Sequence, residues 1–504
     1  MKSRSLFASY LVFWNLLVSV AFIPATPARA ALLPATTFYV DGSAGNDTNG
    51  GCFTIGATGT NFVLNAGAYN FTNLASTSGT TNPSIVTSAS HNFVAADVGN
   101  CLHVTAGTSW LPGFYRIVSV ATNAATLDRA VASSASVTNG TFFVGGALQT
   151  IVATVAISSR VASQQIFVKA SATYTITQDI VLSTAVSPTT TAPPNQLVGY
   201  TTTPGDGGKA SITLSTNTGL TAINGSGIIG WYIRNFIINC STLGTSTGIT
   251  VDDNSMIQNV KVSNCTTANI TTVNNVSGVT VMDSELTGCT SACTATINAN
   301  ARTQILRNWI HDNASPGIKG GTPTTAFNLF SNNTGASSDC VGAIGTGQLI
   351  LNNTFYKCGR DGIRGLGTSL GLSNHIRNNL FVSNVGAGIT GASAPGWAAY
   401  PQYDGNAYFG NASTRVNMDD TGTVNAGNAA APYTNVFDVI LTADPFTNAA
   451  GGDFTLNNTA GGGKAARGTG TPGAISAATG TGKIDFGAFQ AATAAAGSKG
   501  AYAQ

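Results

Sequence analysis

The sequence predicts an all-β chain that coils into a parallel β-helix, and three observations carry this prediction. Between residues 227 and 392 the chain repeats itself about every 24 residues. Within each repeat, apolar and polar residues alternate with the period of a β-strand that has one face inside. Small or amide-bearing side chains recur at one inward position, where stacked coils let each amide bond to those above and below. We therefore expect one solenoid coil per repeat.

A column of cysteine, asparagine and glycine residues sets the register of the coils. The anchors are Cys240, Cys265, Cys289, Asn313, Asn333, Gly359 and Asn384. Three residues before the anchors lie apolar residues that we expect inside the helix: Ile237, Val262, Leu286, Ile310, Phe330, Tyr356 and Phe381. Five residues before the anchors, on the same inner face, lie Asn235, Val260, Ser284, Asn308, Asn328, Thr354 and Asn379. Positions six, four and two before each anchor are then expected to face outward as a ribbon of aligned side chains.

The composition indicates a folded chain with a neutral polar surface. Only 8% of the 504 residues are charged, 43% are hydrophobic, and the net charge is +2. A disordered chain combines low hydrophobicity with high net charge, which is the opposite pattern. The charge balance gives no reason to expect nucleic acid or an anionic membrane as a partner.

Residues 1–30 have the features of a secretory signal peptide. Lys2 and Arg4 precede an apolar stretch over residues 6–23, and Ala28-Arg29-Ala30 supplies a small-x-small cleavage site. The apolar stretch is long, so an uncleaved membrane anchor is the alternative. The prediction is a secreted protein, extracellular or at the cell surface, with no membrane partner once the signal is cleaved.

The rest of the chain divides into four predicted parts. Residues 31–147 are expected to form an N-terminal cap with a small β lobe, because their short strands lack the column pattern. Residues 148–410 are expected to form the parallel β-helix. Residues 411–490 are expected to be a β capping segment, since an end coil exposes unpaired backbone groups. Residues 491–504 are expected to be a disordered tail.

The eight cysteines favour disulfides in an exported protein. Cys240 and Cys265 lie one coil apart in the same column, so their separation suits a disulfide. The simplest remaining pairs are Cys289 with Cys293, Cys340 with Cys358, and Cys52 with Cys101. Metal binding is the alternative, but the chain has only four histidines and no CxxC pair.

Three stretches resemble a known family. They are FYVDGSAGNDTNGG at residues 38–51, IFVKASATYTIT at residues 166–177 and LVGYTTTPGDGGKASI at residues 197–212. Together with the NxxIxxN-type coils, they are similar to secreted right-handed parallel β-helix proteins of the pectate-lyase-like superfamily. The resemblance covers residues 36–490 and implies the right-handed fold. It is carried by structural strands and turns, so it does not carry an activity.

The outward ribbon holds the candidate catalytic residues Asp283, Glu285, His311, Lys261 and Arg307. On one strand face, the carboxyls of Asp283 and Glu285 would lie roughly 6 to 7 Å apart. That separation is near the lower end of what inverting glycoside hydrolysis needs for an acid and a base with water between them. Lys261, Arg307 and His311 would then bind the substrate. The simpler interpretation is two surface ion pairs, Lys261 with Glu285 and Asp283 with Arg307, each worth little.

A polysaccharide lyase would instead need a Lys or Arg base beside the acidic carbon of the sugar. It would also need calcium or another cation to neutralise the uronate carboxylate. Lys261, Arg307 and Lys357 are candidate bases, and calcium stays an optional cofactor because Asp283 and Glu285 are the only obvious close carboxylates. The aspartate pairs of polygalacturonases and the Trp-Ile-Asp-His pattern of pectate lyases do not occur here in matching form.

The candidate substrate-binding residues are Trp309, Lys357, Arg234, Arg360 and Asp361. A tryptophan on the ribbon can stack on a sugar ring. Arg360 and Asp361 lie in a loop after Lys357, where loops of a solenoid often build a binding groove, and a plain turn is the alternative. No metal site is recognisable.

The sequence therefore predicts a β-helix protein that engages extracellular polysaccharide. It leaves open whether the protein is a polysaccharide lyase or a glycoside hydrolase, a non-catalytic glycan-binding or adhesive surface protein, or a structural fibre component. The sequence gives no oligomeric state.

Overall fold

The computed structural model describes the chain from residue 37 to residue 467, with gaps. The described ranges are residues 37–52, 70–157, 164–183, 188, 193–215, 219–241, 244–273, 278–300, 302–320, 324–336, 338–342, 347–365, 374–390, 402–412, 416–417 and 438–467. The predicted signal peptide and the predicted C-terminal tail lie outside these residues. No helix in the described ranges is long and apolar enough to cross a membrane.

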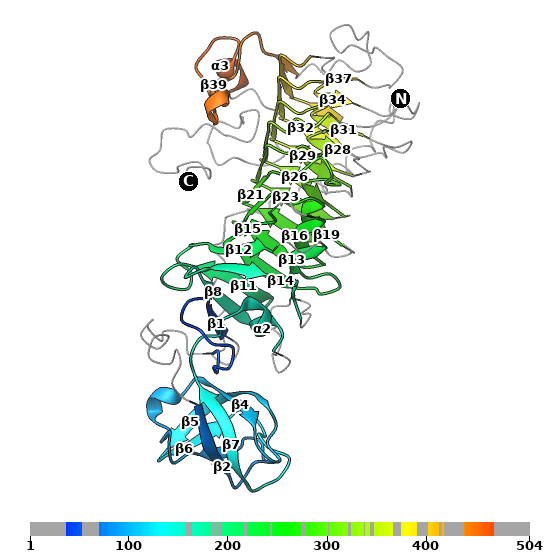
Figure 1. The fold of residues 1–504 in the computed structure, drawn as a ribbon. Helices are drawn as coiled ribbons and strands as arrows, with labels where there is room; N and C mark the ends of the chain where they lie inside the picture. The colour runs from blue at the N-terminus through cyan, green and yellow to red at the C-terminus, as the bar shows by residue number, and fades with distance from the viewer. Residues whose placement is uncertain are drawn as a thin grey trace, which may run out of the picture.

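Three long parallel sheets wind around one another as a right-handed parallel β-helix, which confirms the predicted fold (Figure 1). Each coil contributes one strand to each sheet, and each strand pairs with its equivalent in the next coil. The first sheet contains β1 Thr37–Asp41, β8 Gln165–Lys169, β11 Asn195–Tyr200, β14 Trp231–Arg234, β17 Met256–Gln258, β20 Val279–Met282, β23 Thr303–Leu306, β26 Thr324–Ala326, β29 Leu349–Leu351, β32 His375–Arg377 and β35 Gln402–Asp404.

The second sheet carries the candidate functional residues. It contains β9 Thr173–Ile176, β12 Ala210–Leu214, β15 Phe236–Asn239, β18 Lys261–Ser263, β21 Glu285–Thr287, β24 Trp309–His311, β27 Leu329–Ser331, β30 Thr354–Tyr356, β33 Leu380–Val382, β36 Ala407–Phe409 and β38 Val439–Ile440. The third sheet contains β10 Ile180–Val181, β13 Leu220–Asn224, β16 Ser246–Val251, β19 Ala268–Thr272, β22 Ile297–Asn298, β25 Ile318–Lys319, β28 Val341–Gly342, β31 Ile363–Arg364, β34 Ile389–Thr390 and β37 Val416–Asn417.

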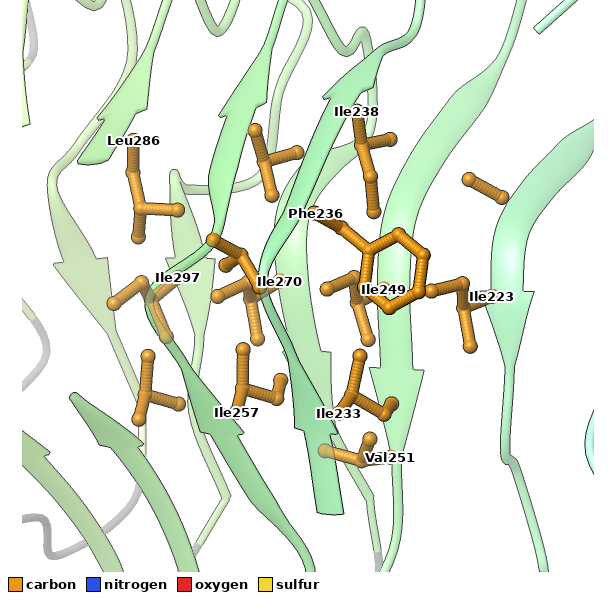
Figure 2. Packing of buried hydrophobic residues seen from close by; sticks show 14 of the residues in the cluster. Ile223, Ile233, Phe236, Ile238, Ile249, Val251, Ile257, Ile270, Leu286 and Ile297 are labelled. Carbon is orange, nitrogen blue, oxygen red and sulfur yellow. The ribbon is translucent and has the colours of Figure 1, made fainter. Parts of the chain in front are cut away.

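Stacked apolar side chains fill the interior of the helix. All members of one inward column of the second sheet are fully buried: Ile238, Val262, Leu286, Ile310, Phe330, Phe355 and Phe381. Figure 2 shows Ile238 and Leu286 of this column among the packed apolar side chains. In the upper coils the rings of Phe330, Phe355 and Phe381 stack with centroids 5.0 and 4.8 Å apart. Because every coil repeats the same contacts, burial of apolar area grows with each added coil.

Asparagine ladders run up the inside of the upper coils. Each Nδ2 of Asn308, Asn328 and Asn353 donates to the Oδ1 of the next ladder member, at 3.0 Å in each case. Asn379 continues the ladder to Asn406 at 3.1 Å. The ladder satisfies side-chain amides that would otherwise be costly to bury.

The predicted register was wrong by one residue in two coils. Ile237, expected inside, is 36% exposed, and its neighbour Ile238 takes the inner position. In a later coil Cys358, not Gly359, occupies the anchor column, where its backbone N–H donates to Asn384. The same shift places Asn353 inside and Thr354 outside. An extra residue at a corner changes the spacing without disturbing the stack, so spacing alone does not locate it.

From β14 to β33, a single left-handed residue turns the chain at the corner between the first and second sheets. This column runs Asn235, Asn259, Asp283, Arg307, Phe327, Asn352, Asn378, with φ between 52° and 63°. Asn and Asp tolerate this backbone region best among non-glycine residues, which explains most of the column. A second left-handed corner follows the second sheet and includes Asn264, Asp312, Asn332 and Lys357.

A closed six-stranded antiparallel barrel lies between β1 and β8 in sequence and beside the N-terminal end of the helix (Figure 1). It contains β2 Asn70–Ser76, β3 Ile85–Thr87, β4 Cys101–Ala106, β5 Gly113–Ala121, β6 Ala124–Leu127 and β7 Val137–Val144, with the 3-10 turn η2 Ala95–Asp97. The helix α2, Ile151–Val155, follows the barrel, and its Ile151 and Val155 pack into the core of the first coils.

Four disulfides join all eight cysteines in the pairs that the sequence predicted. They are Cys52–Cys101, Cys240–Cys265, Cys289–Cys293 and Cys340–Cys358. The first joins Cys52, which follows β1, to Cys101 on β4 of the barrel. The other three lie within the coils.

After β38, the described chain forms a small C-terminal unit on the outer face of the second sheet. It consists of β39 Phe446–Asn448, the 3-10 turn η4 Ala449–Gly451, β40 Asp453–Leu456 and the helix α3 Gly463–Ala466. β39 and β40 pair as an antiparallel hairpin. Figure 1 shows this unit in orange beside the C-terminal coils.

Candidate functional site

The outer face of the second sheet changes character along the helix. From β15 to β24, one outward column contains Ile237, Lys261, Glu285 and Trp309, and the other contains Asn239, Ser263, Thr287 and His311. From β27 to β36 the same columns contain Leu329, Thr354, Leu380, Ala407 and Ser331, Tyr356, Val382, Phe409. The polar half is open, whereas the apolar half lies under the C-terminal unit.

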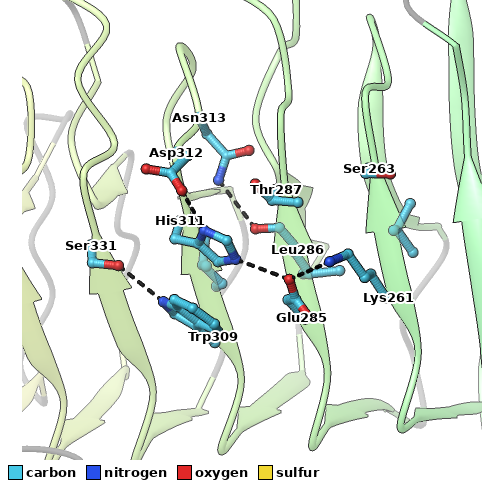
Figure 3. Close-up of polar contacts among 12 residues, drawn as sticks. Lys261, Ser263, Glu285, Leu286, Thr287, Trp309, His311, Asp312, Asn313 and Ser331 are labelled. Atoms are coloured by element: carbon cyan, nitrogen blue, oxygen red, sulfur yellow. Dashed lines mark hydrogen bonds and ion pairs between the residues drawn. The ribbon is translucent and has the colours of Figure 1, made fainter. Parts of the chain in front are cut away.

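A chain of polar contacts crosses three neighbouring strands of the open half (Figure 3). Lys261 Nζ lies 2.8 Å from Glu285 Oε1, and His311 Nε2 lies 3.3 Å from the same oxygen. The other ring nitrogen of His311, Nδ1, lies 2.7 Å from Asp312 Oδ2. The side chain of His311 is only 9% exposed, so these two carboxylates fix the orientation of its ring.

Glu285 is held as a carboxylate by these partners. Its hydrogen bond with His311, helped by Lys261, outweighs burial and lowers the pKa of Glu285 to about 2. A carboxyl with so low a pKa does not carry a proton near neutral pH. Glu285 is therefore suited to binding and orienting cations or hydroxyl groups, and unsuited to the role of a general acid.

Trp309 lies at the upper edge of the open half. Its ring stacks on His311 with centroids 3.8 Å apart and an angle of 22° between the planes. Its Nε1 donates to Ser331 Oγ at 2.9 Å. The ring is thus held in place from two sides and keeps an apolar surface at the edge of the polar cluster.

Lys209 lies toward the N-terminal end of the same region, directly before β12 and three strands from Glu285 on β21, and the sequence analysis missed it. It is half-buried, and no hydrogen bond or ion pair within the described residues engages its ammonium group. Burial lowers the pKa of Lys209, Glu285 acts to raise it, and Lys261 lowers it further. The residue lies before the aligned repeat, in a Gly-Gly-Lys turn. The proximity of a turn to the ribbon was the only available signal.

The turn before Lys209 is tied down by Asp206. The carboxylate of Asp206 accepts hydrogen bonds from the backbone N–H groups of residues 201, 202, 203 and 208 and from the Thr201 hydroxyl. Burial acts to raise the pKa of Asp206, but these hydrogen bonds outweigh it and lower the pKa. These hydrogen bonds to Asp206 fix the backbone from which Lys209 extends.

We call Lys209, Lys261, Glu285, Trp309, His311 and Asp312 the Glu285 cluster. Asp283 and Arg307 were expected on the same face and do not belong to it. Both occupy the left-handed corner between the first and second sheets, with φ of 52° and 53°. Arg307 donates to both carboxylate oxygens of Asp283 at 2.7 and 3.0 Å, and Gln258 Nε2 donates to Oδ2 at 3.1 Å. Asp283 and Glu285 therefore do not share a strand face, because the corner separates them.

Arg234 and Lys357 also lie outside the Glu285 cluster. Arg234 ends β14 in the first sheet, where its guanidinium donates to Gln196 at 2.7 Å. Lys357 occupies the left-handed corner after β30, and its ammonium group lies over the ring of Tyr356. The expected single ribbon of charge is thus divided among two sheets and two corners.

Arg360 and Asp361 belong to a buried charge cluster between β30 and β31. Arg360 forms a bidentate ion pair with Asp339. Its Nε lies 2.8 Å from Oδ1, and its Nη2 donates to Oδ2. Arg364 pairs with Asp361 at 3.1 Å. Burial raises the pKa of Asp339, while Arg360 acts to lower it. Asp339 and Asp361 are almost fully buried, so this cluster is positioned to hold neighbouring coils together.

No group of three or more His, Cys, Asp or Glu side chains in the described parts of the chain is arranged to hold a metal ion. The Glu285 carboxylate instead lies against Lys261 and His311. The cluster contains four chemical features. They are the half-buried amine of Lys209, which has no ion-pair partner among the described residues, the Lys261–Glu285 ion pair, the imidazole of His311 held between two carboxylates, and the ring edge of Trp309.

No family model matches the chain, and no curated protein matches it. Among solved structures, the chain is similar to a pectate lyase at 13% identity and a TM-score of 0.41, over 68% of this chain and 91% of that chain. It is similar to the A-module of an Azotobacter vinelandii mannuronan C-5 epimerase at 14% identity and a TM-score of 0.38, over 55% and 78%. The Dettilon tailspike protein follows at 12% identity and a TM-score of 0.27, over 55% and 60%. We therefore take the fold from the strand order of this chain, and these low similarities carry no functional argument.

Proposed function

We propose that the open half of the second sheet binds a linear acidic polysaccharide and cleaves it by β-elimination. The observation that carries this proposal is Lys209, a half-buried amine with no ion-pair partner among the described residues, whose pKa is lowered by burial and also responds to the charges of Glu285 and Lys261. Proton abstraction from carbon needs a base, and burial lowers the pKa of Lys209, which favours its neutral form.

The residues of the Glu285 cluster then have separate roles. Neutral Lys209 removes the proton α to the carboxylate of a uronate unit. Lys261, held against the ionised Glu285, neutralises that carboxylate as negative charge develops on it. The released electron pair forms a carbon–carbon double bond, and the glycosidic carbon–oxygen bond breaks. The leaving oxygen takes a proton from solvent water, because both ring nitrogens of His311 are already held by carboxylates, and Trp309 packs against a sugar ring.

The geometry supports hydrolysis less well. An inverting hydrolase needs one protonated and one ionised carboxyl across a water-sized gap. Glu285 has a pKa of about 2, and Asp283 accepts hydrogen bonds from two nitrogens of Arg307 at the corner of the coil. Neither carboxyl is in the surroundings of a general acid.

Glycan binding without turnover is the second candidate. Trp309 favours it, because a fixed aromatic edge beside hydroxyl-bearing side chains is a general sugar-binding arrangement. The same face would serve both functions. They differ in whether Lys209 is needed for product formation or only for affinity.

We further propose that the protein is secreted and works outside the cell. The four disulfides support an oxidising compartment. N-terminal sequencing of the exported protein would test the predicted cleavage after Ala30. Export with an intact N-terminus would contradict it.

The direct test of the role of Lys209 is Lys209→Met against Lys319→Met as a matched control. Lys319 lies on β25 in the third sheet and is also half-buried. We expect Lys209→Met to lower kcat on acidic polysaccharide by at least about a hundredfold, the usual contribution of a general base. Lys319→Met should leave kcat unchanged. Equal kcat for the two variants would remove Lys209 from the chemistry.

A further inference from the structure

The outer face of the second sheet is closed at one end of the Glu285 cluster. The side chains of Lys261 and Glu285 are 40% and 29% exposed. One coil beyond Trp309, Leu329 is only 2% exposed, and Leu380 and Val382 in later coils are fully buried. The face therefore passes from open to covered within the step from β24 to β27.

The cover is the C-terminal unit. Tyr356, which points outward from β30, meets the rings of Phe446 and Phe454 at 5.9 and 5.3 Å. The outward side chains of β27, β30, β33 and β36 share one apolar cluster with this unit. Sealed aromatic packing of this kind leaves no room for a sugar chain over those coils.

Trp309 stands at the boundary. Its ring is partly buried against the same apolar cluster and stacks on His311 on the side of the open half. Its indole nitrogen is bonded to Ser331, which is buried in the first covered coil. Trp309 is thus the last side chain of the open face and part of the wall that ends it.

In the opposite direction, no described residue covers the face in this way. Ile237 on β15 is 36% exposed, and the outward Thr173 and Thr175 on β9 are exposed. Five coil steps separate β24 from β9, which amounts to about 24 Å at about 4.8 Å per coil. A sugar chain can therefore extend from the Glu285 cluster only toward the N-terminal coils.

We propose that the site receives the end of a polysaccharide chain and not an internal segment. The terminal sugar lies against Trp309, and the chain runs over β21, β18, β15 and β12 toward β9. This inference rests on the proposed function, because it concerns the same face and the same class of ligand. Action at such a site releases short products of one size from one end of the chain.

The test uses acidic oligosaccharides that carry a bulky group on the reducing end, on the non-reducing end, or on neither. Affinity is measured by titration calorimetry with the Lys209→Met variant, so that no ligand is consumed. We expect one of the two caps to weaken binding by at least about tenfold, a change that calorimetry resolves easily. The other cap should leave affinity unchanged, because its end of the chain projects beyond β9.

If both caps weaken binding equally, or if neither cap weakens it, the chain-end inference is overturned and the proposed function stands. Failure of every acidic oligosaccharide to bind, capped or uncapped, would overturn the proposed function itself. Early products of the wild-type protein provide the second measurement. A single short product from the first time point agrees with the inference, and a broad mixture of sizes contradicts it.

Discussion

Lys261 Nζ and Glu285 Oε1 lie 2.8 Å apart on neighbouring strands, and both charges act on the amine of Lys209. If Lys209 is the base, as proposed, activity should rise with pH as Lys209 loses its proton. The ionised Glu285 raises the pKa of Lys209, and the ammonium of Lys261 lowers it.

The two charges should therefore shift the pH profile of kcat/KM in opposite directions. Glu285→Gln removes a negative charge and should move the rising limb to lower pH. Lys261→Met removes a positive charge and should move it to higher pH. The measured quantity is the midpoint of the limb, so a general loss of activity does not hide the shift. Midpoints that stay fixed, or move the same way, would exclude Lys209 as the titrating base.

Trp309→Ala should weaken binding of acidic oligosaccharide by about tenfold, which corresponds to about 1.4 kcal/mol for a lost aromatic contact. Trp309→Phe keeps an aromatic ring and loses only the hydrogen bond to Ser331. We expect the phenylalanine variant to retain most of the affinity. Fluorescence or calorimetric titration distinguishes the two. Equal weakening in both variants would assign the effect to the displaced ring position instead of sugar stacking.

Asn328→Ala should lower the free energy of unfolding by about 3 kcal/mol, because it leaves buried donors and acceptors above and below without partners. Asn328 donates to Ile305 O and Asn353 Oδ1, and it accepts from Asn308. Asn70→Ala, at an exposed position on the barrel, serves as the control and should change stability little. Denaturant unfolding measures both. A similar small effect for the two variants would show that the ladder contributes little to stability.

Arg360→Met should destabilise the protein by about 3 to 5 kcal/mol, since it leaves the carboxylate of Asp339 buried without its partner. Asp339→Leu in the same chain should restore part of that loss, because an apolar pair carries no desolvation cost. The double-mutant cycle is read from thermal or denaturant unfolding. Additive losses in the double variant would indicate that the two side chains act independently.

The sequence predicted the fold well because the patterns that define a β-helix lie within one strand or between neighbouring coils. Alternation within a strand and repetition between coils are both visible in the residues, and Cys240 and Cys265 could be paired because they lie about one coil apart. The corners between the strands were harder to predict from the sequence. Asp283 and Glu285 read as neighbours on one face until the left-handed backbone of Asp283 is known.

The candidate site was only partly predictable. Lys261, Glu285, His311 and Trp309 follow from the strand register, since outward positions on adjacent coils stack. Lys209 belongs to a turn before the aligned repeat, and its position depends on the hydrogen bonds that the Asp206 carboxylate accepts in that turn. The C-terminal unit that closes the face is far away in sequence, and its docking depends on apolar outward residues such as Leu329 and Leu380.

The most direct test of the central claim is the product chemistry on acidic and neutral polysaccharides, measured as ultraviolet absorbance of unsaturated uronate together with new reducing ends. We predict that acidic polysaccharide yields both signals in equal amounts, with wild type active and Lys209→Met silent. Neutral polysaccharide should yield neither signal. New reducing ends without unsaturated product would contradict β-elimination at Lys209, and they would return the open face of the second sheet to a hydrolytic role.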